Sequence, residues 1–292
     1  MSILVTGSTG FIGTNLVKFL SDRNLEVTEL IRHKHLDKKN NDSNLQVQTL
    51  TFSNSDEIDK IFKTHHFDFV INLATTYSPE EDIYYVIDSI NSNIIFPAQL
   101  IANCIKYEIP FITFGTYLQQ TSIEQNKRSF YLESKLVIHD LLNKLAQSEN
   151  IKYIEIILND TYGPGDKRSK VLYSILNSLK GVNLEATEGN QLINLLHVND
   201  VCSAIFTLIT QLKEKKIEFN ATFSVRSLHF YTIRELVDLC EKATGLKAEI
   251  NWGAREYRGN EIFEVPKLSP ILPNWQEKIL LSESIFDIMN GI

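Results

Sequence analysis

The chain has 292 residues, of which 43% are hydrophobic and 22% charged, a composition typical of a globular protein with a substantial core. Its formal net charge of −7 disfavours a general nucleic-acid-binding protein, which normally has a basic face. No apolar run is long enough to span a bilayer, and the first residues lack the features of a signal peptide, so we expect a cytoplasmic protein without membrane partners.

The first element is a short apolar strand that runs into a glycine-rich turn and a helix, over residues 2–13. Gly7 permits a tight turn, Gly10 lets the backbone approach a pyrophosphate, and Gly13 lets the helix lie close to the strand. A helix N-terminus attracts anions through its unpaired N–H groups. We therefore expect a dinucleotide site here; an ordinary strand–helix turn is the alternative. The predicted cofactor-binding residues of this turn are Gly7, Thr9, Gly10, Phe11, Ile12 and Gly13.

A second strand is predicted over residues 25–32, and its end bears on the choice of cofactor. Sites that prefer NAD usually have Asp or Glu at this point to bind the ribose hydroxyls, whereas this chain has Ile31 followed by Arg32. A guanidinium suits a 2′-phosphate, so NADP(H) is favoured over NAD(H). The alternative is a solvated basic loop, since residues 34–44 are polar.

Strands and helices then alternate along the chain. Strands are expected at 47–50, 68–74, 111–116 and 153–158, and helices at 56–65, about 82–107, around 131–135, 201–212, 232–244 and 283–289. This alternation predicts an α/β fold with a doubly wound parallel sheet of the Rossmann type. We expect a dinucleotide-binding domain from residues 1–159 and 192–222, and a smaller C-terminal α/β substrate-binding subdomain from residues 160–191 and 223–292.

The three cysteines, Cys104, Cys202 and Cys240, are far apart in the sequence and form no C-x-x-C pair. The spacing suggests neither a disulfide framework nor a zinc site, so we interpret all three as buried apolar residues and expect no metal.

Tyr131 and Lys135 form the only Y-x-x-x-K pair of the chain. Residues four apart on a helix lie on one face, so the ammonium can sit near the phenol. A free tyrosine has a pKa of about 10, and a lysine cation together with an oxidised nicotinamide would lower it. This arrangement suits proton transfer at neutral pH. A tyrosine and a lysine on a helix surface are the structural alternative.

The G-x-x-G-x-x-G turn and the Tyr131 to Lys135 segment, with Ser134 before the lysine, resemble the short-chain dehydrogenase/reductase superfamily. Over its whole length the chain is similar to the extended branch, the nucleotide-sugar epimerases, dehydratases and 4-ketoreductases. Residues 73–77, 114–116, 161–166 and 258–261 resemble a narrower group, the CDP-abequose and CDP-paratose synthases. Those enzymes are NADPH-dependent reductases of CDP-4-keto-3,6-dideoxyhexoses in bacterial O-antigen pathways.

The resemblance implies roles for individual residues. Tyr131 is the expected acid, Thr116 the hydrogen-bonding partner of the substrate carbonyl, and Lys135 also a ligand of the nicotinamide ribose. Further cofactor contacts are implied for Leu73, Ala74, Thr75 and Asn93. Substrate contacts are implied for Thr75, Tyr77, Thr116, Asp160, Lys170, Arg255 and Arg258.

The resemblance also implies a homodimer that acts on a nucleotide-linked 4-keto-6-deoxy or 4-keto-3,6-dideoxy hexose, with CDP favoured and dTDP or GDP possible. Two departures bear on the nucleotide: many relatives have Arg-Asp at Ile193 and Asn194, and Asn at Asp160. Two alternatives stay open, a 4-epimerase that retains NAD and a non-catalytic dinucleotide-binding protein. Arg32 favours the reductase, since an epimerase would more often have an acidic residue there.

Overall fold

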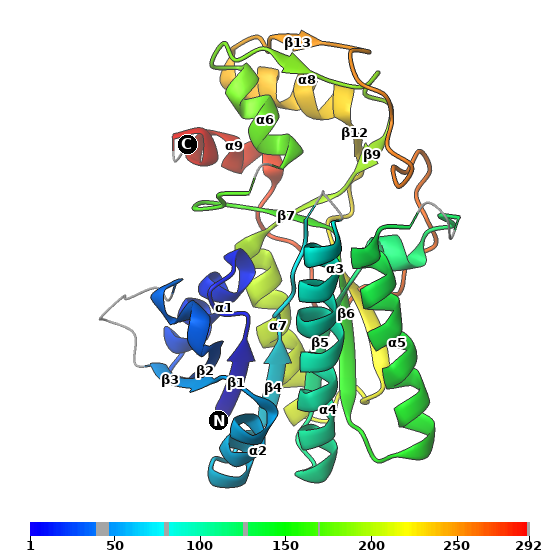
Figure 1. Ribbon diagram of the computed structural model, residues 1–292. Helices are drawn as coiled ribbons and strands as arrows, with labels where there is room; N and C mark the ends of the chain where they lie inside the picture. The colour runs from blue at the N-terminus through cyan, green and yellow to red at the C-terminus, as the bar shows by residue number, and fades with distance from the viewer. Residues whose placement is uncertain (39–46, 79–81, 125–127, 169, 291–292) are drawn as a thin grey trace.

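The computed structural model describes residues 1–38, 47–78, 82–124, 128–168 and 170–290. Within these ranges, seven parallel strands form one sheet in the order β11-β6-β5-β4-β1-β2-β3 (Figure 1). Its strands are β1 (Ser2–Thr6), β2 (Glu26–Arg32), β3 (Val47–Phe52), β4 (Phe69–Asn72), β5 (Phe111–Thr116), β6 (Tyr153–Leu158) and β11 (Ala221–Val225). The predicted doubly wound parallel sheet is confirmed.

Helices cover both faces of this sheet, so its strands are apolar on both sides. One face packs against α1 (Phe11–Ser21) and α7 (Val198–Lys213), in a core that includes Ile3 and Ile156. The other face packs against α2 (Ser55–Thr64), α4 (Phe96–Lys106) and α5 (Phe130–Ser148). The two cores explain why the runs in β4, β5 and β6 contain almost no exposed residue.

The helix expected over residues 82–107 is helical throughout but not uniform. It consists of α3 (Ile83–Ser89), a π-helical segment η2 (Ile90–Ile95) and α4. A π-helical turn inserts a residue into the α-helical repeat and changes the directions of the neighbouring side chains, and such turns are frequent at functional sites. Ser92 and Asn93 lie in this segment and are both buried.

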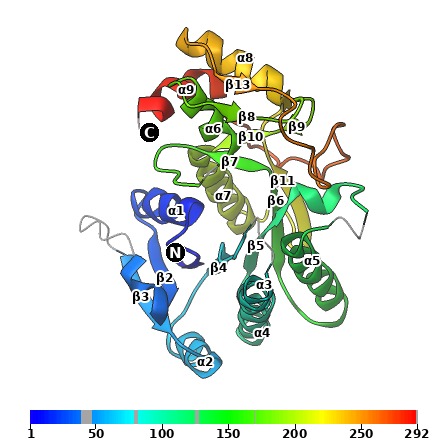
Figure 2. The ribbon, with the colours of Figure 1, turned by 45° about the horizontal axis from the view of Figure 1, so that its top comes forward.

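A smaller group of elements lies beyond the carboxyl ends of the sheet strands (Figure 2). Three short strand pairs are found there: β7 (Asp160–Tyr162) with β10 (Leu195–His197), β9 (Leu192–Ile193) with β12 (Tyr231–Thr232), and β8 (Leu184–Glu185) with β13 (Ile250–Asn251). The helices α6 (Val171–Ser178), α8 (Ile233–Thr244) and α9 (Leu281–Asn290) enclose a separate core. The proposed domain boundaries stay a prediction. The boundary between residues 222 and 223 falls within β11.

Two 3-10 segments, η1 (His33–Lys38) and η3 (Tyr117–Gln120), follow β2 and β5 directly. Residues 34–38 of the expected 34–44 loop therefore belong to η1, and residues 39–44 lie outside the described residues. All three cysteines are buried and free, as expected. In the described ranges, no helix combines the length and apolar character that crossing a membrane requires.

Candidate active site

The glycine turn lies at the carboxyl end of β1, in the middle of the sheet, where open α/β sheets bind ligands. Gly7 has a φ of +71°, and a Cβ there would lie 2.5 Å from the backbone nitrogen of Ala74. A Cβ on Gly13 would lie 2.1 Å from the carbonyl oxygen of Gly7. Both positions therefore require glycine. The segment after β4 passes too close to Gly7 for a side chain, and the backbone of Gly7 and Ser8 passes too close to Gly13 in α1.

The N-terminus of α1 is suited to a phosphate group. Gly10 occupies the cap position in an extended conformation, so no side chain caps the helix, and the first turn has no acidic residue. The buried hydroxyl of Ser8 has no hydrogen-bond partner among the described residues. Thr9, Phe11 and Ile12 belong to the same turn. These unpaired donors fit the pyrophosphate of a dinucleotide.

Arg32, at the end of β2, is held in place by the π-helical segment. Its Nη2 donates to the Ser92 hydroxyl at 2.9 Å, and its guanidinium carbon lies 5.8 Å from the centre of the Phe96 ring. Burial lowers the pKa of Arg32, an effect that the carboxylate of Asp88 opposes. The guanidinium is thus oriented by the protein rather than extended into solvent.

Asn93 connects the segment after β4 with α5. Its Oδ1 accepts hydrogen bonds from the Thr76 backbone nitrogen at 2.7 Å and from the Thr75 hydroxyl at 3.2 Å. Its Nδ2 donates to the Thr76 carbonyl oxygen at 2.9 Å and to the Ser134 hydroxyl at 3.1 Å. Asn93 thereby fixes the segment that contains Leu73, Ala74 and Thr75 relative to the helix that carries Tyr131 and Lys135.

Lys135 and Tyr131 lie on one face of α5, as the spacing predicts. The Lys135 Nζ donates to the Phe114 carbonyl oxygen at 2.9 Å and lies 5.7 Å from the centre of the Tyr131 ring. Thr116, at the end of the same strand β5, is buried and caps η3, its hydroxyl accepting from the Leu118 backbone nitrogen at 3.4 Å.

In the protein alone, burial is the largest influence on the ionisation of both residues. Burial raises the pKa of the Tyr131 phenol, and the charge of Asp160 acts in the same direction, whereas Arg168 opposes the rise. Burial also lowers the pKa of Lys135 to about 8, although the charge of Glu155 opposes this shift. The protein's own side chains therefore keep Tyr131 protonated, the form that a proton donor needs.

Three of the predicted substrate residues come together beside Tyr131. The rings of Tyr77 and Tyr131 meet edge to face, with centres 5.2 Å apart. Lys170 donates to the Asp160 carboxylate at 2.9 Å, and its Nζ lies 5.8 Å from the centre of the Tyr77 ring. The hydroxyl of Thr75, another predicted substrate residue, donates to Asn93 instead. Tyr77 and Lys170 are separated widely in the sequence, so the fold and not a local motif assembles this group.

The two C-terminal arginines are placed differently. Arg255 is exposed and faces Glu185 of β8, with Nε and Oε2 3.8 Å apart. Arg258 is also exposed and begins the turn that carries Glu261. Burial raises the pKa of the Tyr117 phenol, and the charges of Asp160 and Glu261 act in the same direction. The Oε2 atom of Glu261 is buried and has no hydrogen-bond partner among the described residues. The charges of Glu261 and Asp160 thus both act on Tyr117, whereas the ion pair described for Arg255 is with Glu185.

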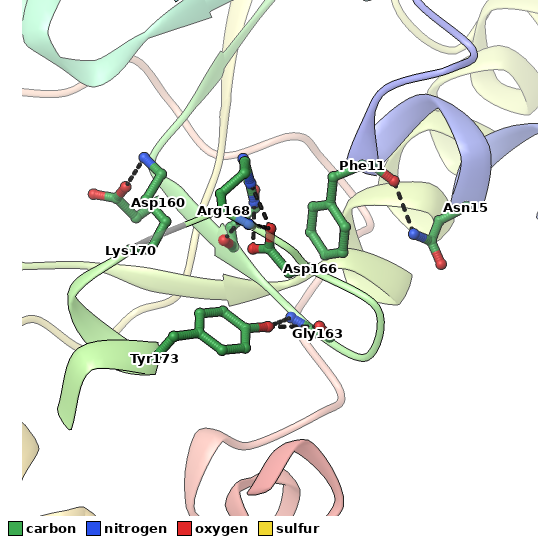
Figure 3. Close-up of polar contacts among 9 residues, drawn as sticks. Phe11, Asn15, Asp160, Gly163, Asp166, Arg168, Lys170 and Tyr173 are labelled. Carbon is green, nitrogen blue, oxygen red and sulfur yellow. Dashed lines mark hydrogen bonds and ion pairs between the residues drawn. The ribbon is translucent and has the colours of Figure 1, made fainter. Parts of the chain in front are cut away.

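Sequence reasoning did not identify Arg168, which connects the glycine turn to the smaller group of elements (Figure 3). Arg168 forms a two-pronged ion pair with the buried Asp166, both distances being 2.7 Å, and donates to the Thr161 carbonyl oxygen at 3.0 Å. Its guanidinium carbon lies 4.5 Å from the centre of the Phe11 ring. Only the basic character of residues 167–170 could have indicated it, since its partners lie in the fold.

Three comparisons relate the chain to known proteins. Residues 3–221 match the NAD dependent epimerase/dehydratase family. A CDP-abequose synthase from Salmonella typhimurium strain LT2 is 24% identical over 273 residues, 89% of this chain and 87% of the relative. A UDP-glucose 4-epimerase from Halalkalibacterium halodurans is 23% identical over 285 residues, 86% of this chain and 83% of the relative. The structure of MoeE5 in complex with UDP-glucuronic acid and NAD has a TM-score of 0.79 at 16% identity, covering 100% of this chain and 98% of that one.

The family match spans most of the chain, so this protein belongs to the NAD dependent epimerase/dehydratase family. The predicted membership, and with it an enzyme that uses a nicotinamide dinucleotide, is confirmed. The glycine turn and the unpaired donors at α1 fit that cofactor. Within the described parts of the chain, no group of three or more His, Cys, Asp or Glu side chains is arranged to hold a metal ion.

Proposed function

We propose that this protein is an NADPH-dependent reductase of the C4 keto group of a nucleotide-linked 4-keto-6-deoxy or 4-keto-3,6-dideoxy hexose. CDP is the favoured nucleotide, with dTDP and GDP as the other candidates, and the product serves bacterial surface polysaccharide synthesis. The observation that carries the proposal is the Tyr131 and Lys135 pair, fixed by Asn93 beside the glycine turn and Arg32. The similarity to CDP-abequose synthase supports the substrate class.

The proposed chemistry uses residues that lie together at the carboxyl ends of β4, β5 and β6. A bound dihydronicotinamide supplies the hydride to the carbonyl carbon. Tyr131 donates its phenolic proton to the carbonyl oxygen, which Thr116 also contacts by a hydrogen bond. Lys135 holds the cofactor ribose and stabilises the phenolate that forms. Because the protein keeps Tyr131 protonated before the reaction, the proton is available when the hydride arrives.

The proposed substrate site lies over Tyr77 and the Lys170 and Asp160 pair. Lys170 and Arg258 supply positive charge for the nucleotide diphosphate, and the unpaired oxygen of Glu261 supplies a hydrogen-bond acceptor for a hydroxyl group. Arg255 stays a predicted substrate contact of this region. Incubating the protein and NADPH with CDP-, dTDP-, UDP- and GDP-linked 4-keto sugars, and identifying the products by NMR, tests this assignment.

The second candidate function is a 4-epimerase that retains NAD. It is favoured by the similarity to a UDP-glucose 4-epimerase and would use the same Tyr131, Lys135 and Thr116. Interconversion of an unmodified UDP-hexose, with no NADPH oxidation by any 4-keto sugar, would establish the epimerase in place of the reductase.

We expect the unmodified protein to bind NADPH more tightly than NADH, and Arg32→Ala to remove this preference. A charged hydrogen bond to the 2′-phosphate is worth about 1.5–3 kcal/mol, so the preference should fall by about 10- to 100-fold. Titrations that follow the fluorescence of each cofactor at low and high salt measure it. Lys34→Ala, an exposed basic residue nearby, is the control. A preference for NADH in the unmodified protein would contradict the assignment of Arg32.

We further propose a homodimer that pairs through α3. Ile83, Tyr84 and Ile87 project from this helix with 64%, 80% and 51% of their surfaces exposed, and Val137 on the neighbouring α5 is 44% exposed. Ile87→Asp should convert the dimer to a monomer in light-scattering measurements, because it places a charge in an apolar interface. Phe286→Asp, on the exposed side of α9, should leave the mass unchanged. A monomeric unmodified protein would refute this proposal.

A further inference from the structure

Behind the Tyr131 and Lys135 pair, the structure contains a buried carboxylate that the proposed chemistry does not use. Glu155 lies in the middle of β6, between Thr113 of β5 and Thr222 of β11, and only 2% of its side chain is exposed. A buried carboxylate is costly unless it is paired and hydrogen-bonded. Its presence in the centre of an otherwise apolar strand therefore points to a role beyond packing.

Glu155 and Lys135 line the same small cavity, between α5 and the sheet. The other residues of its wall include Asn72, Asn93 and Thr113. The negative charge of Glu155 favours the charged form of Lys135 and opposes the effect of burial on that lysine. The cavity lining thus includes both Asn93 and the Glu155 carboxylate, and Lys135, whose Nζ lies 5.7 Å from the centre of the Tyr131 ring, also lines it.

Glu155 also contacts His139, a residue that is partly exposed to solvent. Its Oε2 lies 2.6 Å from the Nδ1 of His139, which is one helical turn beyond Lys135 on α5 and has 34% of its side chain exposed. Hydrogen bonding to Glu155 raises the pKa of His139, and the charge of Asp140 acts in the same direction. The Nε2 of His139 lies 2.9 Å from the Nδ2 of Asn143.

The remaining contacts hold the carboxylate in one position. Its Oε1 accepts from the Gln119 Nε2 at 3.2 Å, and its Oε2 accepts from the Thr222 hydroxyl at 3.4 Å. A Cβ on Gly115 would lie 2.9 Å from the Glu155 Oε1 and closer still to the Gln119 side chain, so the glycine makes room for both. The titratable groups that interact with Glu155 are Lys135, His139 and the Tyr153 phenol.

We propose that Glu155 and His139 form an acid–base pair that keeps Lys135 protonated and returns protons to it from solvent. This inference rests on the proposed reductase function and deepens it. Each reduction consumes one proton besides the hydride: the Tyr131 O–H bond breaks as the new O–H bond of the alcohol forms. The phenolate regains a proton from Lys135, Lys135 regains one through Glu155 and His139, and His139 takes one from water. Glu155 and His139 are positioning residues, since they act through Lys135.

The first test needs no substrate. Competitive labelling of Lys135 with acetic anhydride over a range of pH, followed by mass spectrometry, measures the pKa of Lys135 in the protein alone. Glu155→Gln keeps the size of the side chain but removes its charge, and it should lower the pKa of Lys135 by about 1 unit or more. Glu29→Gln, another buried carboxylate in the same sheet, should leave it unchanged. An unchanged pKa in Glu155→Gln would overturn the proposal.

The second test uses the half-exposed histidine, whose replacement disturbs the core less than that of Glu155. With any 4-keto sugar that the protein reduces, His139→Gly should lower turnover about 10-fold or more and increase the solvent isotope effect, with KM for the sugar unchanged. Added imidazole should restore turnover, because it can occupy the vacated place beside Glu155. His65→Gln, at the end of α2, is the control. Normal turnover in His139→Gly, or a loss that imidazole does not restore, would overturn the proton route.

The two tests separate this inference from the proposed function. If no 4-keto sugar is reduced, the reductase assignment fails, while labelling still shows whether Glu155 controls the charge of Lys135. If the sugars are reduced normally and labelling shows no shift, the reductase stands and the role of Glu155 is refuted.

Discussion

Tyr131→Phe should leave the protein folded and reduce turnover by about 10²–10⁴-fold, the usual contribution of a positioned proton donor. The variant removes only the hydroxyl, so the edge-to-face contact of the ring with Tyr77 is retained. Rates of NADPH oxidation with a 4-keto sugar, together with the thermal unfolding temperature, measure the two effects separately.

Tyr107→Phe, at the C-terminal end of α4, is a matched control that should retain full turnover. NADPH binding by Tyr131→Phe should stay close to that of the unmodified protein, since the glycine turn and Arg32 are untouched. Near-normal turnover in Tyr131→Phe would remove this residue from the mechanism.

Lys135→Ala should reduce turnover by two orders of magnitude or more and also weaken NADPH binding, because Lys135 is assigned two tasks. The variant removes the hydrogen bond to the Phe114 carbonyl oxygen as well as the cation. Steady-state rates and cofactor titrations report on the two tasks separately. Lys144→Ala, an exposed lysine on the same helix, should change neither. Loss of cofactor affinity alone would show that the cation has no part in the proton transfer.

The pH dependence of the unmodified enzyme provides a second measure of the same residue. Burial lowers the pKa of Lys135 to about 8, so its ammonium form is complete well below pH 8 and is lost as the pH rises through that value. The turnover should therefore decline on the alkaline side with a midpoint near pH 8. Glu155→Gln should move this decline to lower pH, because the stabilising negative charge is gone.

The sequence contains most of the information for the fold and for the central pair. The runs that form β4, β5 and β6 can be recognised in the sequence because both faces of these strands are covered, so that most of their residues are apolar. A Cβ at Gly7 or Gly13 would overlap the backbone, so the glycine spacing, together with the apolar strand before it and the helix after it, predicts the turn. Tyr131 and Lys135 are local neighbours on one helix, and helical periodicity brings them to one face.

Other parts of the site depend on contacts that no local pattern reveals. The π-helical segment at Ile90–Ile95 turns Ser92 toward Arg32 and Asn93 toward Ser134, whereas the sequence predicted a regular helix. Arg168 meets Phe11 only because the two parts of the chain fold against each other. In the sequence, Glu155 is a single polar residue in an apolar run. Its contact with His139 depends on the packing of α5 against the sheet.

The fate of the hydride tests the central claim most directly. NADPH carrying deuterium at the transferable C4 position of the nicotinamide should be oxidised in an amount equal to the 4-keto sugar consumed, and NMR should find the deuterium at C4 of the sugar product. A reductase must give this result, since the hydride leaves the cofactor permanently. Interconversion of a UDP-hexose without net NADPH oxidation and without deuterium in the sugar would contradict the account.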